Sequence, residues 1–249
     1  MERHKSPVKM SLRLHRVADM ITPGLTVADI GTDHGYIPIY QVLTGNADYA
    51  YACDVAEGPL NRAGDNVLLY NVGDRVRTVL SDGLEGLKDI KENVPRAIVI
   101  AGMGGALICR ILKDGADVAE RADELVLSPH SEWYEVRCFL RNNGYEIIDE
   151  DMLKEDGKYY VIIKAVPVDE SQSGTVEAHL DEDGLRFGPV LMKKRHPVLI
   201  EYIEKELDTY AKIKKNLIEN GGSGAKEKLA EFEDKENNLR RVLWKITEV

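Results

Sequence analysis

Two carboxylates and two glycines lie within seven residues of one another, directly after a short hydrophobic run. The segment reads Asp29-Ile-Gly-Thr-Asp-His-Gly35. Gly31 and Gly35 allow a tight turn and a close approach of the backbone to a ligand. The second acid, Asp33, disfavours a dinucleotide, because a pyrophosphate needs helix-terminal N–H groups and no negative charge nearby. The segment therefore favours a cationic or zwitterionic ligand.

Three further hydrophobic runs end in residues that suit the same ligand. Asp54 follows the second run, where a carboxylate can accept both hydrogen bonds of a ribose diol. The third run leads to Asp82 and Gly83. Asp82 can accept a hydrogen bond from an adenine amino group, and Gly83 leaves room for the adenine ring. The fourth run ends in Gly102-Met-Gly104, a segment in which the flexible thioether of Met103 is the main side chain. S-adenosylmethionine carries a sulfonium group, an ammonium group and an adenosine. These groups match the residues at the ends of all four hydrophobic runs.

The spacing of the hydrophobic runs predicts the elements that position these residues. Short strands are predicted at Leu25–Ile30, Tyr49–Cys53, Val76–Leu80, Ala97–Ile100 and Leu125–Leu127. Helices are predicted at Met10–Met20, Ile37–Leu43, Leu60–Tyr70, Ala106–Leu112 and Glu132–Asn142. Short apolar strands that alternate with helices indicate an α/β fold with a parallel sheet covered on both faces. Two further runs, Tyr145–Leu153 and Lys158–Val166, predict a final antiparallel hairpin.

The remainder of the chain has a different character. Residues 167–184 are polar and turn-rich, which indicates a linker. Apolar residues then recur at three- and four-residue steps in Pro197–Asn220 and Ala225–Glu248, with a glycine-rich loop between them. This pattern predicts an antiparallel coiled-coil hairpin. We therefore expect one α/β domain over residues 1–166, and the linker and hairpin over residues 167–249.

Composition narrows the class of protein. The 249 residues are 43% hydrophobic and 31% charged, values typical of a globular protein. Cys53, Cys109 and Cys138 form no CxxC pair, which argues against a disulfide framework or a zinc knuckle and favours a reducing cytoplasm. The longest nearly apolar run, Ala97–Ile108, is too short to span a bilayer. We expect no metal, no membrane contact and no signal peptide.

Several motifs together resemble one known family. In chain order they are Leu12-Arg-Leu14, Val27–Pro38, Asp54-Val55, Ser81–Glu85, Ile100–Gly105, Asn143–Glu146 and Glu155–Tyr160. On these residues the chain resembles the bacterial tRNA adenine-N1 methyltransferases that modify position 22, the TrmK family. The resemblance implies a Rossmann-like seven-strand methyltransferase domain, S-adenosylmethionine as the methyl donor, tRNA as the partner and a C-terminal coiled-coil hairpin.

The strand ends and the resemblance together predict the residues of the site. The predicted cofactor-binding residues are Asp29, Gly31, Asp33, His34, Gly35, Asp54, Asp82, Gly83, Gly102 and Met103. The predicted catalytic residues are Gly102, Met103, Gly104 and His130. His130 stands in Ser128-Pro-His130, where many members of the family carry Gln-Pro-Asn. This departure lies on the acceptor side of the predicted site.

The implied reaction needs little acid–base chemistry. Adenine N1 has a free lone pair, so methylation depends on the alignment of nitrogen, carbon and sulfur. In folded tRNA this nitrogen is shielded, and we expect the base to flip into the site. Candidates to stack on the flipped base are Trp133, Tyr134 and Tyr36. The alternative is that each of these rings packs under its own helix. His130 is a candidate to form a hydrogen bond with the adenine edge. The alternative is that His130 is a polar loop residue without a role in the reaction.

The net charge of −10 includes two basic segments. Residues 1–16 and 186–215 each carry +4, whereas residues 17–185 carry −17. Basic side chains gathered in space attract phosphates. We therefore predict tRNA contacts at Arg13, Arg16, Lys193, Lys194, Arg195, Lys212, Lys214 and Lys215. The alternative is two solvated helical faces on an acidic protein.

Other functions are compatible with the same residues. One is a methyltransferase acting on another RNA or on a small molecule. Another is a non-catalytic module that binds tRNA or protein, although the intact acids of the donor site argue against it. A nicotinamide-dependent dehydrogenase would need a GxGxxG loop, and Asp33 and His34 occupy positions where that loop must be small and uncharged.

Overall fold

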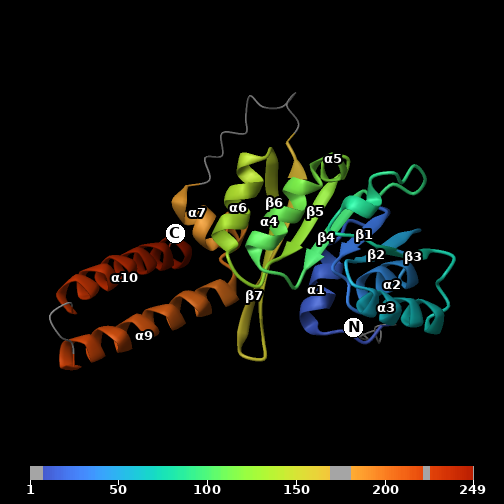
Figure 1. Ribbon diagram of the computed structural model, residues 1–249. Coiled ribbons are helices and arrows are strands. Elements are labelled where there is room, and N and C mark those ends of the chain that lie inside the picture. Colours follow the sequence, from blue (N-terminus) through green and yellow to red (C-terminus); the bar gives the residue numbers. More distant parts are fainter. Residues whose placement is uncertain (1–7, 169–180, 221–224, 249) are drawn as a thin grey trace. The chain divides into compact units, whose positions relative to one another are not determined.

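The chain divides into two compact units, Met1–His179 and Leu180–Val249. A computed structural model describes residues 8–168, 181–220 and 225–248 (Figure 1). The first unit holds one seven-stranded sheet in the order β3-β2-β1-β4-β5-β7-β6. Its parallel strands are β1 (Val27–Ile30), β2 (Ala50–Asp54), β3 (Val76–Leu80), β4 (Ala97–Ala101) and β5 (Glu124–Ser128). The antiparallel strands are β6 (Tyr145–Glu155) and β7 (Lys158–Pro167).

Helices cover the sheet as the alternating pattern predicts. They are α1 (Leu12–Met20), α2 (Tyr36–Leu43), α3 (Glu57–Leu69), α4 (Gly105–Asp114), α5 (Ala116–Ala119) and α6 (Trp133–Asn142), with a 3₁₀ turn η1 (Glu85–Leu87). The fully buried strands β1 and β5 are covered on both faces, which explains their continuous apolar sequences. The sequence-based prediction of the α/β fold and of its final antiparallel hairpin is confirmed.

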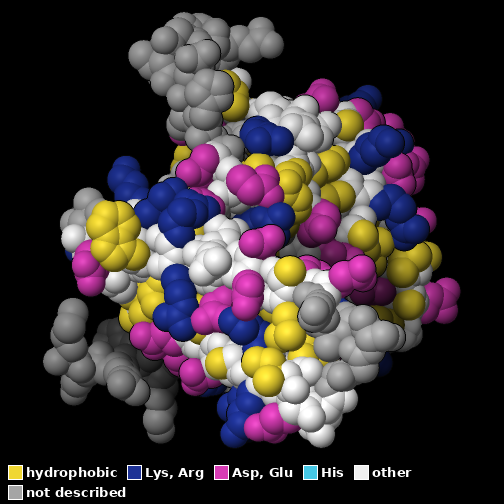
Figure 2. All heavy atoms as spheres, turned by 90° about the vertical axis from the view of Figure 1, so that its left-hand side faces the viewer, with side chains coloured by type: hydrophobic (Ala, Val, Ile, Leu, Met, Phe, Trp, Pro, Cys, Tyr) yellow, Lys and Arg dark blue, Asp and Glu magenta, His cyan; other side chains and the backbone are white. Residues whose placement is uncertain are grey.

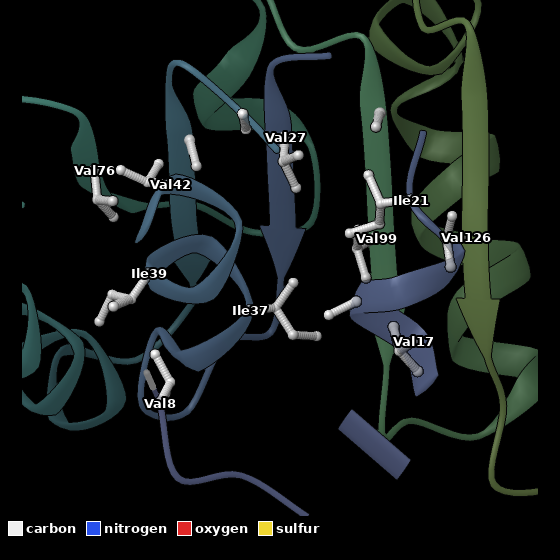
Figure 3. Close-up of a cluster of buried hydrophobic side chains, with 14 of the residues drawn as sticks. Val8, Val17, Ile21, Val27, Ile37, Ile39, Val42, Val76, Val99 and Val126 are labelled. Atoms are coloured by element: carbon white, nitrogen blue, oxygen red, sulfur yellow. The ribbon is translucent and has the colours of Figure 1, made fainter. Parts of the chain in front are cut away.

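One hydrophobic cluster fixes α1 and α2 on the sheet. Val27, Val99 and Val126 come from three adjacent strands and are completely buried. Val17 of α1 and Ile37 of α2 pack in the same cluster (Figure 3). Burial of side chains of this size stabilises the fold by roughly 1.5–3 kcal/mol each. The cluster therefore holds α1 beside the ends of the central strands.

A buried ion pair ties the end of α1 to two strands. Glu124 begins β5, and its carboxylate lies 2.9 Å from the Nζ atom of Lys164 on β7. The backbone N–H of Thr22 donates to Glu124 at 2.8 Å. The Lys164 ammonium also donates to the carbonyl oxygen of Met20, the last residue of α1, at 2.9 Å. These contacts join residues far apart in the chain.

The Glu124→Ala substitution should lower the free energy of unfolding by about 3–5 kcal/mol. The reason is that it leaves the Lys164 ammonium buried without its carboxylate. Urea denaturation measures the loss. The matched control is Asp123→Ala, which removes the exposed pair with Arg96 and should cost less than about 1 kcal/mol. Equal losses in the two variants would contradict a role for burial.

The second unit is helical throughout its described part. Its helices are α7 (Glu182–Phe187), α8 (Pro189–Lys193), α9 (Pro197–Asn220) and α10 (Ala225–Thr247). The rings of Tyr210 on α9 and Phe232 on α10 lie 5.4 Å apart, and Lys214 pairs with Glu236 at 2.7 Å. The two long helices therefore pack against each other, and Figure 1 shows that they run antiparallel, as the sequence predicts.

The predicted linker differs from the structure at both of its ends. Pro167 still belongs to β7, and Glu182 already belongs to α7. The Asp181 side chain caps α7 by accepting a hydrogen bond from the N–H of Gly184 at 2.8 Å. Residues 169–180 of the predicted linker and the glycine-rich loop at 221–224 lie outside the described residues. No helix in the described part of the chain is long and apolar enough to cross a membrane.

Candidate active site

A cavity of about 290 Å³ opens where β1 and β4 end. These two strands are adjacent, and the chain leaves β1 and β4 toward opposite ends of the sheet, so this is the switch point at which open α/β sheets bind ligands. The cavity brings together six of the predicted cofactor-binding and catalytic residues: Asp29, Gly31, Asp33, His34, Gly102 and His130.

Asp29 supplies a buried carboxylate to this cavity and is only 6% exposed. A hydrogen bond from Thr32 stabilises its charge, and Thr32 Oγ1 accepts the N–H of Gly35 at 3.1 Å. Burial outweighs this bond and raises the pKa of Asp29 to about 6. Asp29 is therefore largely ionised at pH 7 and largely protonated at pH 5.

The second acid of the turn is already paired. The carboxylate of Asp33 is exposed and accepts hydrogen bonds from the guanidinium of Arg62 on α3. His34 Nε2 lies 3.2 Å from the same carboxylate, and the His34 ring stacks on Tyr36 with centroids 5.1 Å apart. Asp29 rather than Asp33 thus presents the buried negative charge.

The other predicted strand ends lie along the same edge of the sheet. Asp54 ends β2, and one carboxylate oxygen accepts the N–H of Ala56 at 2.8 Å. Asp82 and Gly83 line a separate cavity of about 480 Å³. Gly83 has a positive φ of +57°, and a Cβ atom there would lie 3.1 Å from Ile111. Gly83 therefore keeps this second cavity open beside α4.

The loop after β4 approaches the turn after β1 very closely. A Cβ atom on Gly31 would lie 1.9 Å from Met103 Cε, so the Met103 side chain occupies that space. Gly102 has a φ of +83°, and a Cβ atom there would lie 3.8 Å from His130 Nε2. A Cβ atom on Gly104 would instead face Glu132, 3.4 Å from its carboxylate. Both Gly31 and Gly102 have a positive φ that favours glycine, and at Gly31 the Met103 side chain also leaves no space for a Cβ atom.

Backbone hydrogen bonds lock the loops after β4 and β5 together. The N–H of Gly102 donates to the carbonyl of Ser128 at 3.1 Å, and that of His130 donates to Met103 at 2.8 Å. Glu132, which sequence reasoning did not select, accepts the N–H of Ala106 at 2.9 Å and caps α4. Glu132 has a φ of +57°, in the left-handed region that residues other than glycine rarely adopt. The backbone is therefore strained at this position.

Arg13, His130 and Tyr160 form an unpredicted cluster at the cavity. The guanidinium of Arg13 lies 5.3 Å from the centre of the Tyr160 ring. The His130 ring meets the same tyrosine edge-on at 5.6 Å. Burial, and then the positive charges of Arg13 and Lys158, lower the pKa of His130. His130 is therefore a neutral imidazole at pH 7. Arg13, which we predicted to contact tRNA near the target base, lines this cavity.

The three candidate stacking rings lie in different surroundings. Trp133 Nε1 donates to the carbonyl of Pro129 at 3.1 Å, which holds this indole against its own loop. Tyr36 already stacks on His34. Tyr134 is half-buried in the first turn of α6. Tyr160 is a further ring in contact with Arg13 and His130, which line the cavity, and only its place in the motif Glu155–Tyr160 pointed to it.

The remaining predicted tRNA residues differ in their charge partners. Arg16 on α1 pairs with Asp151 at 3.5 Å. Lys215 lies 3.9 Å from a carboxylate of Glu219, and Lys214 is held by Glu236. The exposed basic residues of the second unit also include Lys193, Lys194, Arg195 and Lys212. On the face shown in Figure 2, Lys and Arg side chains are interspersed with Asp and Glu.

The strand order and the residues at the strand ends define a Rossmann-like methyltransferase that uses S-adenosylmethionine. The sequence pattern of the family described as "TrmK: tRNA (adenine(22)-N(1))-methyltransferase" matches residues 27–241. The chain belongs to this family. No group of three or more His, Cys, Asp or Glu side chains within the described residues forms a metal site.

Individual relatives cover almost the whole chain. The tRNA (adenine(22)-N(1))-methyltransferase of Bacillus subtilis (strain 168) is 34% identical over 241 residues, 95% of this chain and 98% of that protein. The structure of M. capricolum TrmK with S-adenosyl-homocysteine is 29% identical with a TM-score of 0.79, covering 95% and 99%. A Streptococcus pneumoniae protein solved with S-adenosyl-L-methionine is 30% identical with a TM-score of 0.79, covering 94% and 100%.

Proposed function

We propose that this protein transfers the methyl group of S-adenosylmethionine to N1 of adenine 22 in tRNA. The observation that carries the proposal is the meeting of Asp29, Gly31 and Gly102 in one cavity at the switch point of the sheet. Membership of the TrmK family supports the choice of reaction and substrate. Since its substrate is tRNA, the enzyme would act in the cytoplasm.

The residues present fit the donor. Buried Asp29 offers a carboxylate to the donor's ammonium group, and Asp54 can accept hydrogen bonds from the ribose hydroxyls. Asp82 and Gly83 provide an acceptor and space for the adenine ring. When bound, S-adenosylmethionine supplies an electrophilic methyl group. We assign these three acids to the donor, whereas Asp33 is engaged by Arg62.

The acceptor side works by alignment. The loop Gly102–Gly104 leaves room for adenine N1 to approach in line, because only Met103 projects a side chain from it. Neutral His130 has a free lone pair on one ring nitrogen and can accept a hydrogen bond from the adenine amino group. Tyr160, packed against His130, lends an aromatic surface to the flipped base.

Donor binding should weaken below pH 6. With a pKa of about 6, Asp29 is about nine-tenths ionised at pH 7 and about one-tenth at pH 5. Only the ionised form attracts an ammonium group, so the affinity for S-adenosylhomocysteine should fall about tenfold between these values. Calorimetry across this range measures it. The Asp29→Asn variant should bind weakly with little pH dependence, and a flat profile in the wild type would contradict the assignment.

A direct assay tests the function itself. The protein is incubated with labelled S-adenosylmethionine and unmodified tRNA, and the digested nucleosides are identified. We expect 1-methyladenosine, and none with a tRNA that carries guanine at position 22. Label in another nucleoside, or only with small-molecule acceptors, would favour the other methyltransferase functions. Donor binding without transfer to any tRNA would favour the non-catalytic module.

A further inference from the structure

The β6–β7 hairpin extends past the sheet on the side where the cavity opens. β7 pairs with β5 as far as Ile163, which lies opposite Leu127, one residue before the end of β5. Beyond this point β6 and β7 pair only with each other, as far as Glu155 and Lys158. At about 3.3 Å per residue, Lys158 lies about 13 Å beyond the end of β5. Figure 1 shows the hairpin, in yellow, reaching past the neighbouring strands.

Lys158 lies on the face of this hairpin that is turned toward the cavity. Side chains two residues apart on a strand point to the same face, so Lys158 shares its face with Tyr160. Tyr160 contacts Arg13 and His130, which line the cavity. Burial, then the charges of Arg13 and Lys158, lower the pKa of His130, which agrees with this placement. Lys158 therefore stands beside the cavity, about 7 Å further out along the strand than Tyr160.

The Lys158 side chain is exposed, and among the described residues no carboxylate pairs with it. Glu155 lies directly opposite Lys158, but its carboxylate accepts the backbone N–H of Leu12 at 2.7 Å. Lys154 differs from Lys158 in both respects. It lies on the opposite face of the hairpin, and its Nζ atom lies 5.3 Å from the centre of the Tyr159 ring. The Lys158 ammonium is thus available to an anion that the protein itself does not supply.

A tight turn holds Lys158 in this place. Asp156 and Gly157 both have a positive φ, of +50° and +76°, as in a two-residue type I′ turn. A turn of this type fixes the register of the two strands, and with it the face on which Lys158 lies. The carboxylate of Asp156 is exposed and repels phosphates at the turn itself. We therefore assign only one contact, at Lys158, to the hairpin.

We propose that Lys158 binds a backbone phosphate of the tRNA beside adenosine 22 when that base enters the cavity. This inference rests on the proposed function, because it assumes that the adenine of the tRNA reaches the cavity. Contacts to phosphates fix the position of a nucleic acid without reading its sequence. Lys158 thus positions the target nucleotide and takes no part in the transfer itself. It was not among the predicted tRNA contacts, because it lies in the acidic stretch of the sequence between the two basic segments.

The first test removes the charge by Lys158→Gln. Filter binding over a salt series should show tRNA affinity lowered about fivefold at 0.15 M salt, and the slope of log affinity against log salt flattened by about one unit. Lys158→Arg keeps the charge and should bind tRNA like the wild type. The matched control is Lys154→Gln on the opposite face, which should keep the wild-type slope. Calorimetry without tRNA should give the same affinity for S-adenosylhomocysteine in all these variants.

The second test locates the contact on the tRNA. A neutral methylphosphonate replaces one of the two phosphates that flank adenosine 22. At one of these linkages the wild type should bind about fivefold more weakly, whereas Lys158→Gln should change by less than about twofold, because the partner of that phosphate is already missing. A wild-type salt slope in Lys158→Gln, or equal weakening of wild type and variant at both linkages, would overturn the proposal. A wild type that neither binds nor methylates tRNA would instead reject the proposed function itself.

Discussion

The Gly102→Ala variant should lose about 100-fold or more in kcat/KM for tRNA methylation. The added methyl group would lie 3.7 Å from Arg13 Nη1 and 3.8 Å from His130 Nε2, inside the space where donor and acceptor must meet. A displacement of reacting groups by about 1 Å can cost roughly 100-fold in rate. Initial rates with labelled donor, corrected for the folded fraction, measure the effect.

Gly144→Ala is the matched control for backbone strain. Gly102 and Gly144 both adopt left-handed backbone, with φ of +83° and +75°, so alanine costs roughly 1–2 kcal/mol at each. A Cβ atom on Gly144 meets nothing within 4 Å. Both variants should therefore melt at similarly lowered temperatures, and only Gly102→Ala should lose activity. Near-normal turnover in Gly102→Ala would place the acceptor elsewhere.

Neutralising Lys193, Lys194 and Arg195 together should weaken tRNA binding roughly 100-fold at 0.15 M salt. We propose that these exposed residues at the end of α8 contact the phosphate backbone. Each phosphate contact contributes nearly one unit to the slope of log affinity against log salt, so the slope should flatten by about 2–3 units. Filter binding over a salt series gives both quantities.

The control variant removes three cations of the hairpin whose carboxylate partners are known. These are Lys214 and Arg240, both paired with Glu236, and Lys235, paired with Glu231. Replacing them with glutamine should change the slope by less than about one unit, because these groups are engaged within the protein. A wild-type slope in the first triple variant would favour the reading of the hairpin as a solvated structural arm.

The sheet could be predicted because hydrophobic runs mark buried parallel strands directly. For example, β4 extends one residue beyond the expected Ala97–Ile100, and β5 extends one residue beyond each end of the expected Leu125–Leu127. The short helices α7 and α8 were not predictable in the same way. Helices of five or six residues are marginal alone, and α7 depends on Asp183, which accepts hydrogen bonds from Arg241 and Lys245 of α10.

The donor side of the site followed from the strand ends, but the positions of the Arg13 and Tyr160 side chains did not. Whether Arg13 points outward or into a cavity depends on how α1 docks, and that is fixed by Glu124 and Lys164. Tyr160 reaches Arg13 and His130 because β7 runs antiparallel beside β5. Neither arrangement has a local sequence pattern, so the cluster of Arg13 with Tyr160 emerged only from the fold.

The contacts of Lys164 also set an order of events during protein synthesis. The ends of β1 and β4 leave the ribosome early, yet α1 gains the Lys164 contact only after β7 has been made. Tyr160, on which the Arg13 guanidinium rests, belongs to the same late strand. A nascent chain that stops before β7 therefore lacks the contacts of Lys164 with the end of α1 and of Tyr160 with Arg13. Ribosome-bound intermediates of this protein should remain unable to retain the methyl donor until the last hairpin of the sheet has emerged.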